Sequence, residues 1–196
     1  GQNYTGGFAG ETIGAVMTGC SVNGTESVNG TDYSGGFIGR ASNAVVAGAL
    51  DHLGIQIADF PVNTVMLGCS VNGSANVSAT GSSGKESGYA GGFIGEMRNS
   101  YAVDCSISSL GTVSGKDYTG GFAGLATLGA VTSIDENKGL LDLVKKLLTG
   151  LLNGNITDMD ILNLVGLRPS VISGCTIDGS TISLDASGKY AGGLVG

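Results

Sequence analysis

The heptad YTGGFAG, residues 4–10, decides the fold because the chain repeats it four more times. The other copies are YSGGFIG at 33–39, YAGGFIG at 89–95, YTGGFAG at 118–124 and YAGGLVG at 190–196. Repetition of this kind is typical of proteins whose units bury their apolar faces only by stacking on one another. A phosphate-binding loop would need a helix N-terminus and a lysine or acidic partner after the glycines, and no copy has them. The heptad therefore indicates architecture rather than phosphate chemistry.

The spacing of the heptads defines the repeating unit. Aligned on the fifth residue, the copies lie 29, 56, 29 and 72 residues apart. A second phrase, GCSVNG at 19–24 and 68–73, recurs in altered form as DCSISS at 104–109 and GCTIDG at 174–179. A valine or isoleucine follows each of its cysteines by seven or eight residues. The basic unit is therefore 29 residues long and occurs four times, with insertions in the second and fourth units.

Each unit contains three short runs with the alternation of a β-strand: the Gly-Gly-Phe segment, the cysteine segment and the following valine or isoleucine segment. Gly, Asn, Asp and Ser clusters separate them, as is typical of turns. We predict an all-β fold, a parallel β-solenoid or β-helix of about four 29-residue coils. Residues 1–196 would form a single solenoid segment of a longer protein. Coils about 4.8 Å apart would align equivalent residues into ladders, of which one points inward and comprises Phe8, Phe37, Phe93, Phe122 and Leu194.

The four cysteines occupy one equivalent position per unit: Cys20, Cys69, Cys105 and Cys175. Ladder spacing would spread them over about 14 Å, whereas one tetrahedral metal needs all four sulfurs within about 2.3 Å. We therefore predict no metal site and no cofactor. Disulfides between neighbouring coils stay open as an alternative, because the ladder spacing suits them. The apolar character of cysteine favours an unbonded ladder that faces inward.

The insertions, residues 41–64 and 126–170, are predicted to be helical and to lie at one corner of the solenoid. The first has Ser42 as a helix N-cap and Gly54 just beyond the helix end. The second contains a long amphipathic segment at 133–154 that begins with capping-box spacing.

The apolar side of this long segment is a possible interaction surface. Lysine and aspartate occupy its other side. We favour the interpretation that this apolar side packs on the flank of the solenoid. The alternative is that it forms a groove or a membrane-surface patch that binds a ligand. The residues of this possible surface are Leu140, Leu143, Val144, Leu147 and Leu151.

Composition excludes several function classes. The net charge is −7, and the nine basic residues are scattered, so we predict no nucleic-acid partner. No apolar run approaches the roughly 18 residues of a membrane helix. His52 is the only histidine, and the acidic residues fall mostly in turns and insertions. Because catalysis needs a constellation of such groups, we predict that the chain is not an enzyme.

The heptad and the cysteine phrase together resemble the GLUG-motif repeat. GGLVG at 192–196 nearly matches the sequence that gives this motif its name, and GGFIG at 35–39 and 91–95 are similar to it. The resemblance covers all four units but not the insertions. In that family the repeats occur in large bacterial surface proteins, including adhesins and the non-catalytic regions of immunoglobulin A-cleaving zinc peptidases. The resemblance implies a bacterial cell-surface or extracellular location and a binding or spacing role, and it carries over no catalytic residue.

We therefore expect a non-catalytic structural or adhesive repeat segment that acts as a rigid spacer or a binding surface. Its partner would be an unknown surface ligand, either a glycan or a host protein, or other copies of the chain. One alternative is a self-assembling extracellular filament subunit, because uncapped strand edges template pairing with another chain. A second alternative is a carbohydrate-active β-helix enzyme, which would need two carboxylates close together on one face. Asp158 and Asp160 are near each other, but they lie where a helix start would recruit acids, and spacing alone assembles no catalytic constellation.

Overall fold

The computed structural model describes residues 3–24, 27–46, 60–73, 76–84, 86–127, 169–178 and 182–196. Within these ranges the secondary structure consists of strands β1 to β23, with no helix. The prediction of an all-β fold is therefore confirmed for the described part of the chain.

Most of the strands belong to five parallel sheets, which we call sheets A to E in the order in which the chain meets them. Sheet A contains β1 (Tyr4–Gly6), β6 (Tyr33–Gly35), β13 (Tyr89–Gly91), β18 (Tyr118–Gly120) and β23 (Tyr190–Gly192). Sheet B contains β2 (Ala9–Ile13), β7 (Ile38–Ser42), β14 (Ile94–Arg98) and β19 (Ala123–Thr127). The first strand of each heptad thus lies in sheet A, and the strand after it lies in sheet B.

Sheets C, D and E hold the remaining parallel strands. Sheet C contains β3 (Val16–Thr18), β10 (Thr64–Leu67), β15 (Ser100–Val103) and β20 (Val171–Ser173). Sheet D contains β4 (Ser21–Asn23), β11 (Ser70–Asn72), β16 (Ser106–Ser108) and β21 (Thr176–Asp178). Sheet E contains β5 (Val28–Gly30), β12 (Val77–Ala79), β17 (Thr112–Gly115) and β22 (Ser183–Ala186).

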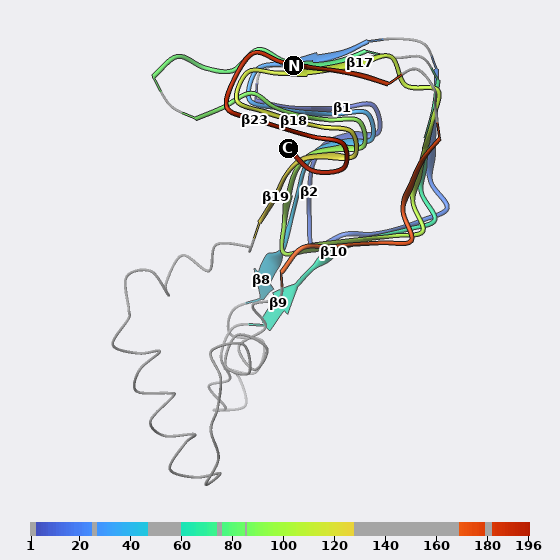
Figure 1. Cartoon of the computed structure of the whole chain (residues 1–196). Coiled ribbons are helices and arrows are strands. Elements are labelled where there is room, and N and C mark those ends of the chain that lie inside the picture. Colours follow the sequence, from blue (N-terminus) through green and yellow to red (C-terminus); the bar gives the residue numbers. More distant parts are fainter. Residues whose placement is uncertain are drawn as a thin grey trace, which may run out of the picture.

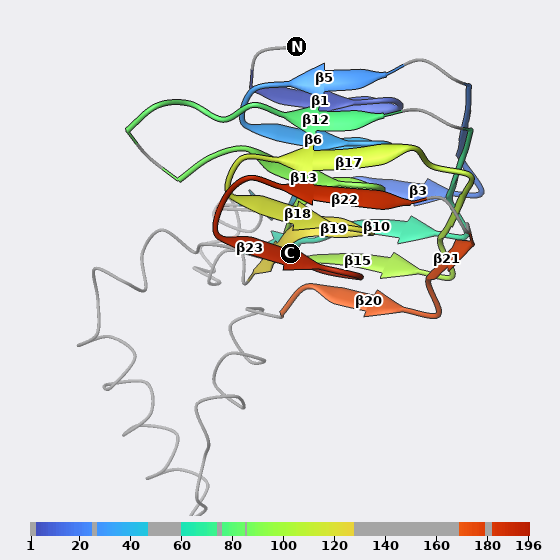
Figure 2. The same cartoon turned by 45° about the horizontal axis from the view of Figure 1, so that its top comes forward.

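The chain runs through the five sheets in a fixed order and then returns to sheet A, so that each passage lies on the previous one (Figures 1 and 2). The register pairs identical heptad positions, as in Tyr33 with Tyr89 and Gly35 with Gly91. Cysteine phrases pair likewise, with Val71 opposite Val22. Stacked parallel strands in this arrangement fit a β-solenoid.

Each passage contributes five strands to the parallel sheets, where the sequence predicted three. In the first four heptads the second glycine and the phenylalanine form a sharp bend between sheets A and B, and Phe93 lies in that bend between β13 and β14. Glycine is also required at the end of β13, next to the bend, because a Cβ atom on Gly91 would lie 1.9 Å from the carbonyl oxygen of Ile94. Period-2 alternation does not separate two short strands joined by such a bend from one longer strand.

The interior is filled by ladders of equivalent apolar side chains. Phe37, Phe93 and Phe122 have no exposed surface, whereas Phe8 is 49% and Leu194 is 46% exposed. The phenylalanine rings stack with centroids 4.8 Å apart at each of the three steps from Phe8 to Phe122. Burying one such side chain contributes about 2–3 kcal/mol, so the inner rungs hold the passages together.

The predicted helix of the first insertion is wrong at its start. Ser42 is the last residue of β7 rather than an N-cap, and β8 (Ala44–Val46) follows almost at once. This strand pairs antiparallel with β9 (Phe60–Val62). The physical reason is that two consecutive valines favour a strand, and Pro61 is tolerated in an edge strand of a two-stranded pair.

The remainder of both insertions lies outside the described residues. This applies to the predicted helix end near Gly54, to the helices predicted within 126–170, and to the possible interaction surface. The residues of that predicted surface are Leu140, Leu143, Val144, Leu147 and Leu151.

Candidate functional site

A row of stacked tyrosines runs along one side of the stacked sheets. The first residue of every sheet A strand is a tyrosine, and in-register pairing places its ring on the next one. Ring centroids are 5.2, 4.8, 4.7 and 4.8 Å apart along the row. The five members are Tyr4, Tyr33, Tyr89, Tyr118 and Tyr190. Because each ring covers the face of its neighbour, the inner members offer a ligand their edges rather than their faces.

A row of alternating charges on sheet B accompanies the tyrosines. The register places Glu11 next to Arg40 and Arg40 next to Glu96. The Arg40 guanidinium lies 3.4 Å from a carboxylate oxygen of each acid. Glu96 is 1% exposed, and its Oε1 lies 2.7 Å from Nη2 of Arg98 and accepts a 2.8 Å hydrogen bond from Nε of the same arginine. Hydrogen bonds between charged groups are among the stronger ones, and Glu96 contacts both arginines, so it holds them in place.

Arg40 joins the two rows. Its Nη1 donates a hydrogen bond of 2.8 Å to the hydroxyl oxygen of Tyr4. The centre of its guanidinium lies 5.3 Å from the ring centroid of Tyr4 and 5.9 Å from that of Tyr33, within the range of a cation–π contact. We call this surface the tyrosine face and define it as the five stacked tyrosines with Glu11, Arg40, Glu96 and Arg98.

The hydroxyl groups of Tyr33 and Tyr89 stay protonated at neutral pH. Burial raises the pKa of Tyr89 to about 12, and the neighbouring tyrosines add to the shift. Burial also raises the pKa of Tyr33, with the carboxylate of Glu96 as the next cause. These two hydroxyls therefore remain hydrogen-bond donors across the physiological pH range.

The loop between β12 and β13 borders the tyrosine face. Glu86 in this loop accepts a 2.6 Å hydrogen bond from Lys189 and a 3.3 Å hydrogen bond from the Tyr118 hydroxyl. The hydrogen bond from Lys189 lowers the pKa of Glu86. Both charged side chains are about half exposed, so water screens this ion pair and it contributes little to stability. It ties the loop to the end of the tyrosine row.

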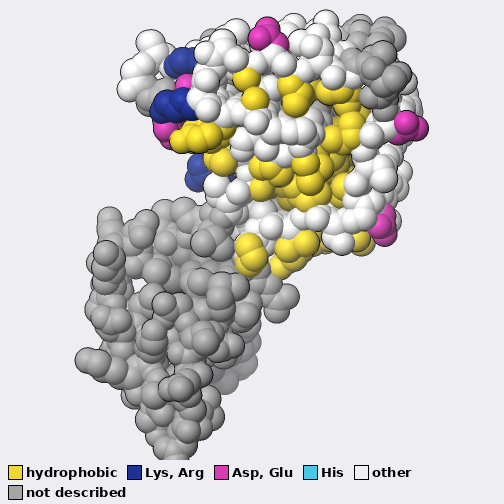
Figure 3. Space-filling model, viewed as in Figure 1, with side chains coloured by type: hydrophobic (Ala, Val, Ile, Leu, Met, Phe, Trp, Pro, Cys, Tyr) yellow, Lys and Arg dark blue, Asp and Glu magenta, His cyan; other side chains and the backbone are white. Residues whose placement is uncertain are grey.

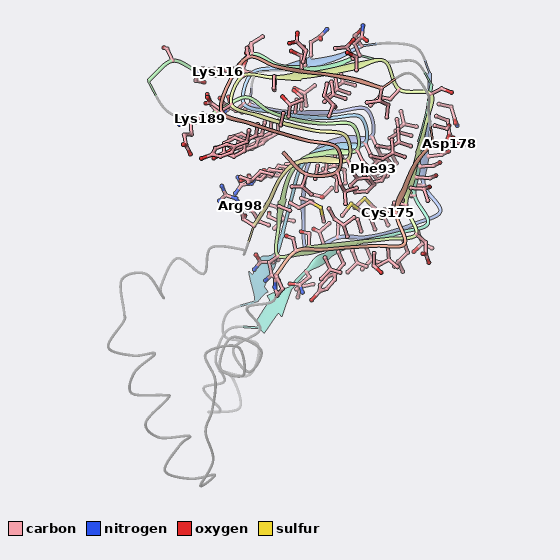
Figure 4. All side chains as sticks on the ribbon, viewed as in Figure 1. Phe93, Arg98, Lys116, Cys175, Asp178 and Lys189 are labelled. Atoms are coloured by element: carbon pink, nitrogen blue, oxygen red, sulfur yellow. The ribbon has the colours of Figure 1, made fainter. Side chains whose placement is uncertain are left out.

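The basic residues of the described chain gather on this side. They are Arg40, Arg98, Lys116 and Lys189. Figure 3 shows the dark blue side chains together beside a yellow patch, while magenta side chains also occur elsewhere. In Figure 4, Arg98, Lys116 and Lys189 lie on one side of the sheets and Asp178 lies on the opposite side. The described part of the chain thus concentrates its positive charge along one edge.

The cysteines form the second feature that the sequence singled out, and all four are free. Cys69 and Cys105 are buried, whereas Cys20 and Cys175 are partly exposed. Each inner thiol points at backbone of the passage before it, with Sγ of Cys105 3.6 Å from the carbonyl oxygen of Met66. Burial raises the pKa of Cys105 to about 12. Within the described ranges no three His, Cys, Asp or Glu side chains are arranged to hold a metal ion.

The burial of the thiols predicts their reactivity. With iodoacetamide at pH 8, Cys105 should react at least tenfold more slowly than Cys20, because it is buried and only its thiolate is nucleophilic. Its rate should rise about tenfold per pH unit up to pH 11, since the pKa is about 12. Mass spectrometry of peptides after timed labelling measures both rates. Fewer than four labelled cysteines in denaturant without reductant would contradict free thiols.

The structure brings together the residues of the predicted inward ladder but also shows a face that sequence reasoning missed. The tyrosines were visible as the first letter of every heptad. The charged row was also encoded, because Glu11, Arg40 and Glu96 each follow the last glycine of a heptad. The alternation of sign at that position was the signal. It was missed because charges 29 or 56 residues apart look unrelated until the register is known.

Known proteins do not identify the chain. No protein-family model, no curated protein and no solved structure matches it. Among the described residues, none belongs to a helix with the length and apolarity needed to cross a membrane. The described residues define an all-β fold in which parallel strands stack from one passage to the next, and the resemblance to GLUG-motif repeats remains a prediction.

Proposed function

We propose that this chain is a non-catalytic segment of a bacterial cell-surface or secreted protein, acting as a rigid spacer or as a binding surface. The observation that carries the proposal is the in-register stacking of two aromatic ladders, the tyrosines that begin the strands of sheet A and the phenylalanines in the bend between sheets A and B. Each rung is fixed by hydrogen bonds between passages, such as Phe37 N to Phe93 O at 2.9 Å. Such a stack keeps a constant spacing and an ordered array of side chains along its length.

The arrangement of the carboxylates supports a structural role for them. Glu96 contacts two arginines, and Glu86 contacts Lys189. Asp32 accepts a 2.7 Å hydrogen bond from the Ser82 hydroxyl, and Asp117 accepts one of 2.9 Å from the backbone N–H of Ser87. A general acid or base must instead reach the reacting group of a substrate. We therefore rank a binding or spacing role above a carbohydrate-active enzyme.

We also infer the finer architecture that this role needs. The sheets would belong to four coils, with a fifth begun at β23, and the parts of 41–64 and 126–170 outside the described residues would form helical insertions at one corner. The spacing of the heptads carries the inferred number of coils, and the amphipathic pattern at 133–154 carries the inferred helices. Partners of two kinds fit a surface segment, namely a glycan or a host protein.

Binding and cleavage assays on the same ligands test the proposal. The purified chain is immobilised and exposed to panels of glycans and of host extracellular proteins, and every glycan is also incubated with the chain and assayed for new reducing ends. We expect retention of a glycan or a protein without the appearance of reducing ends. Time-dependent release of reducing ends would overturn the non-catalytic assignment. Retention of neither class would contradict the binding role.

A further inference from the structure

A small depression lies on sheet E, over β12 and β17. It has a volume of about 260 Å³ and is open to solvent. The polar groups of its lining are the hydroxyls of Ser78, Thr80, Ser114 and Ser187 and the side chain of Lys116. This volume is just below the range of about 300–1,000 Å³ for drug-sized ligands, so the depression suits a group of the size of one sugar ring.

Lys116 is held in a fixed position at the depression. A Cβ atom on Gly81 would lie 2.3 Å from its Cδ, and a Cβ atom on Gly88 would lie 2.6 Å from its Cβ. Both glycines have positive φ values, of 71° and 79°, so the loop passes close over the lysine stem only because these positions lack side chains. The ammonium group donates a 2.5 Å hydrogen bond to the carbonyl oxygen of Ser82.

The charge of Lys116 is not neutralised by a carboxylate within the described residues. Arg40 and Arg98 both contact Glu96, and Lys189 contacts Glu86. Lys116 forms no ion pair in that part of the chain, and the hydrogen bond from its ammonium goes to a neutral carbonyl. An ammonium carries three donors, so two remain for a ligand. Of the four described cations, Lys116 is the one whose charge is available for an anionic group.

One nearby carboxylate opposes anion binding. Asp185 on β22 is the register partner of Ser114, which places it about 4.8 Å away along the ladder. Asp117, next to Lys116, is directed to the N–H of Ser87, and Asp32 is directed to Ser82. Asp185 would therefore lower the affinity for an anion without removing it. This arrangement predicts opposite effects of neutralising Lys116 and Asp185.

We propose that this depression binds an anionic sugar residue of an acidic glycan, with its carboxylate or sulfate group on Lys116 and its hydroxyl groups on the four surrounding hydroxyls. The inference rests on the proposed binding function and specifies the ligand class for one site. Serine and threonine hydroxyls both donate and accept hydrogen bonds, as sugar hydroxyls do. An exposed charge pair is weakened by salt, so binding should be weaker at 300 mM than at 50 mM salt.

Titration calorimetry of the whole chain tests the site with oligogalacturonate as the carboxylated probe, sulfated dextran oligomers as the sulfated probe and neutral dextran oligomers as the control. The probe that binds more tightly identifies the anionic group. Lys116→Met keeps the stem that packs on the glycines and should weaken binding at least tenfold. Lys189→Met removes an equal charge outside the depression and should leave affinity within twofold. Asp185→Asn should tighten binding two- to threefold.

The outcomes separate this inference from the proposed function. Equal binding of neutral and anionic oligomers, or equal loss in the two lysine variants, would overturn the site. So would the absence of any binding at millimolar probe. If Lys116→Met loses oligosaccharide binding but unfolds at a lower urea concentration than the parent, the loss could come from the site or from the fold. Two further variants, Lys116→Gln and Lys116→Arg, then distinguish these causes. The site requires loss with glutamine and retention with arginine. Retention of another glycan or a host protein by Lys116→Met would leave the proposed function standing.

Discussion

Replacement of Phe93 by alanine is expected to lower the free energy of unfolding by about 3–5 kcal/mol. The Phe93 ring has no exposed surface and lies between those of Phe37 and Phe122, with both centroid distances at 4.8 Å. Truncation removes the buried apolar area and leaves a cavity between two rungs that the backbone hydrogen bonds hold apart. Because passages cannot move together without breaking those bonds, the cavity cannot collapse, and the cost should fall in the upper part of the range.

The matched control for this prediction is Phe8→Ala. Phe8 occupies the same heptad position, but it is 49% exposed and stacks on one ring only, that of Phe37. Its truncation should cost about 1 kcal/mol, since half of its surface is already hydrated. Urea unfolding followed by far-UV circular dichroism measures both variants, and the comparison holds where the dependence on urea is unchanged. Equal costs at the two positions would show that stacking between passages does not determine stability.

The sequence was sufficient to predict the period, the all-β class and the members of the phenylalanine ladder, because each depends on residues that recur at one position. The division of each passage into five strands could not be predicted from the sequence. Whether Gly-Gly-Phe continues a strand or bends depends on the backbone of the next passage, which lies 2.2 Å from a Cβ atom built on Gly92. That distance follows from tertiary stacking, and no local pattern contains it.

The candidate sites were less predictable than the fold for a related reason. The tyrosine face needs the register, which aligns Glu11, Arg40 and Glu96 from three separate segments. Predicting the depression at Lys116 would require more than the register, because the depression depends on a loop contact between Gly81 and Lys116, which lies 35 residues later in the chain. That contact arises from an irregular segment that occurs once, so no repetition in the sequence reveals it.

The helix predicted from Ser42 failed because capping signals compete with strand continuation. Ser42 is followed by a residue pattern that suits a helix N-terminus, yet it also ends β7, which is already paired on both sides with β2 and β14. Extending an existing ladder adds hydrogen bonds without the cost of nucleating a helix. Tertiary pairing therefore overrides the local signal at the position where the chain leaves the stack.

Substitution of Gly92 by alanine is expected to destabilise the chain by about 3 kcal/mol or more, at the upper end of the range for overpacked positions. A Cβ atom there would lie 2.2 Å from the carbonyl oxygen of Gly121 and 2.7 Å from a methyl carbon of Leu110. The carbonyl belongs to the backbone of the next passage, so relief requires two neighbouring passages to separate. Since the strands on either side of the bend are paired in register, that separation would break hydrogen bonds in both sheet A and sheet B.

Gly193→Ala is the matched control, because Gly193 is the second glycine of its own heptad and a Cβ atom there meets nothing within 4 Å. The same chemical change should therefore cost less than about 0.5 kcal/mol, as at an ordinary surface position. The two variants are compared by the urea midpoint and, if Gly92→Ala is insoluble, by the fraction of soluble protein. Equal midpoints would mean that the glycines serve local turn conformation alone. Gly92 and Gly193 occupy the same position of the heptad, but only Gly92 has the backbone of another passage against it. A large difference between the two variants would therefore mean that the second glycine is needed so that one passage can lie directly on the next.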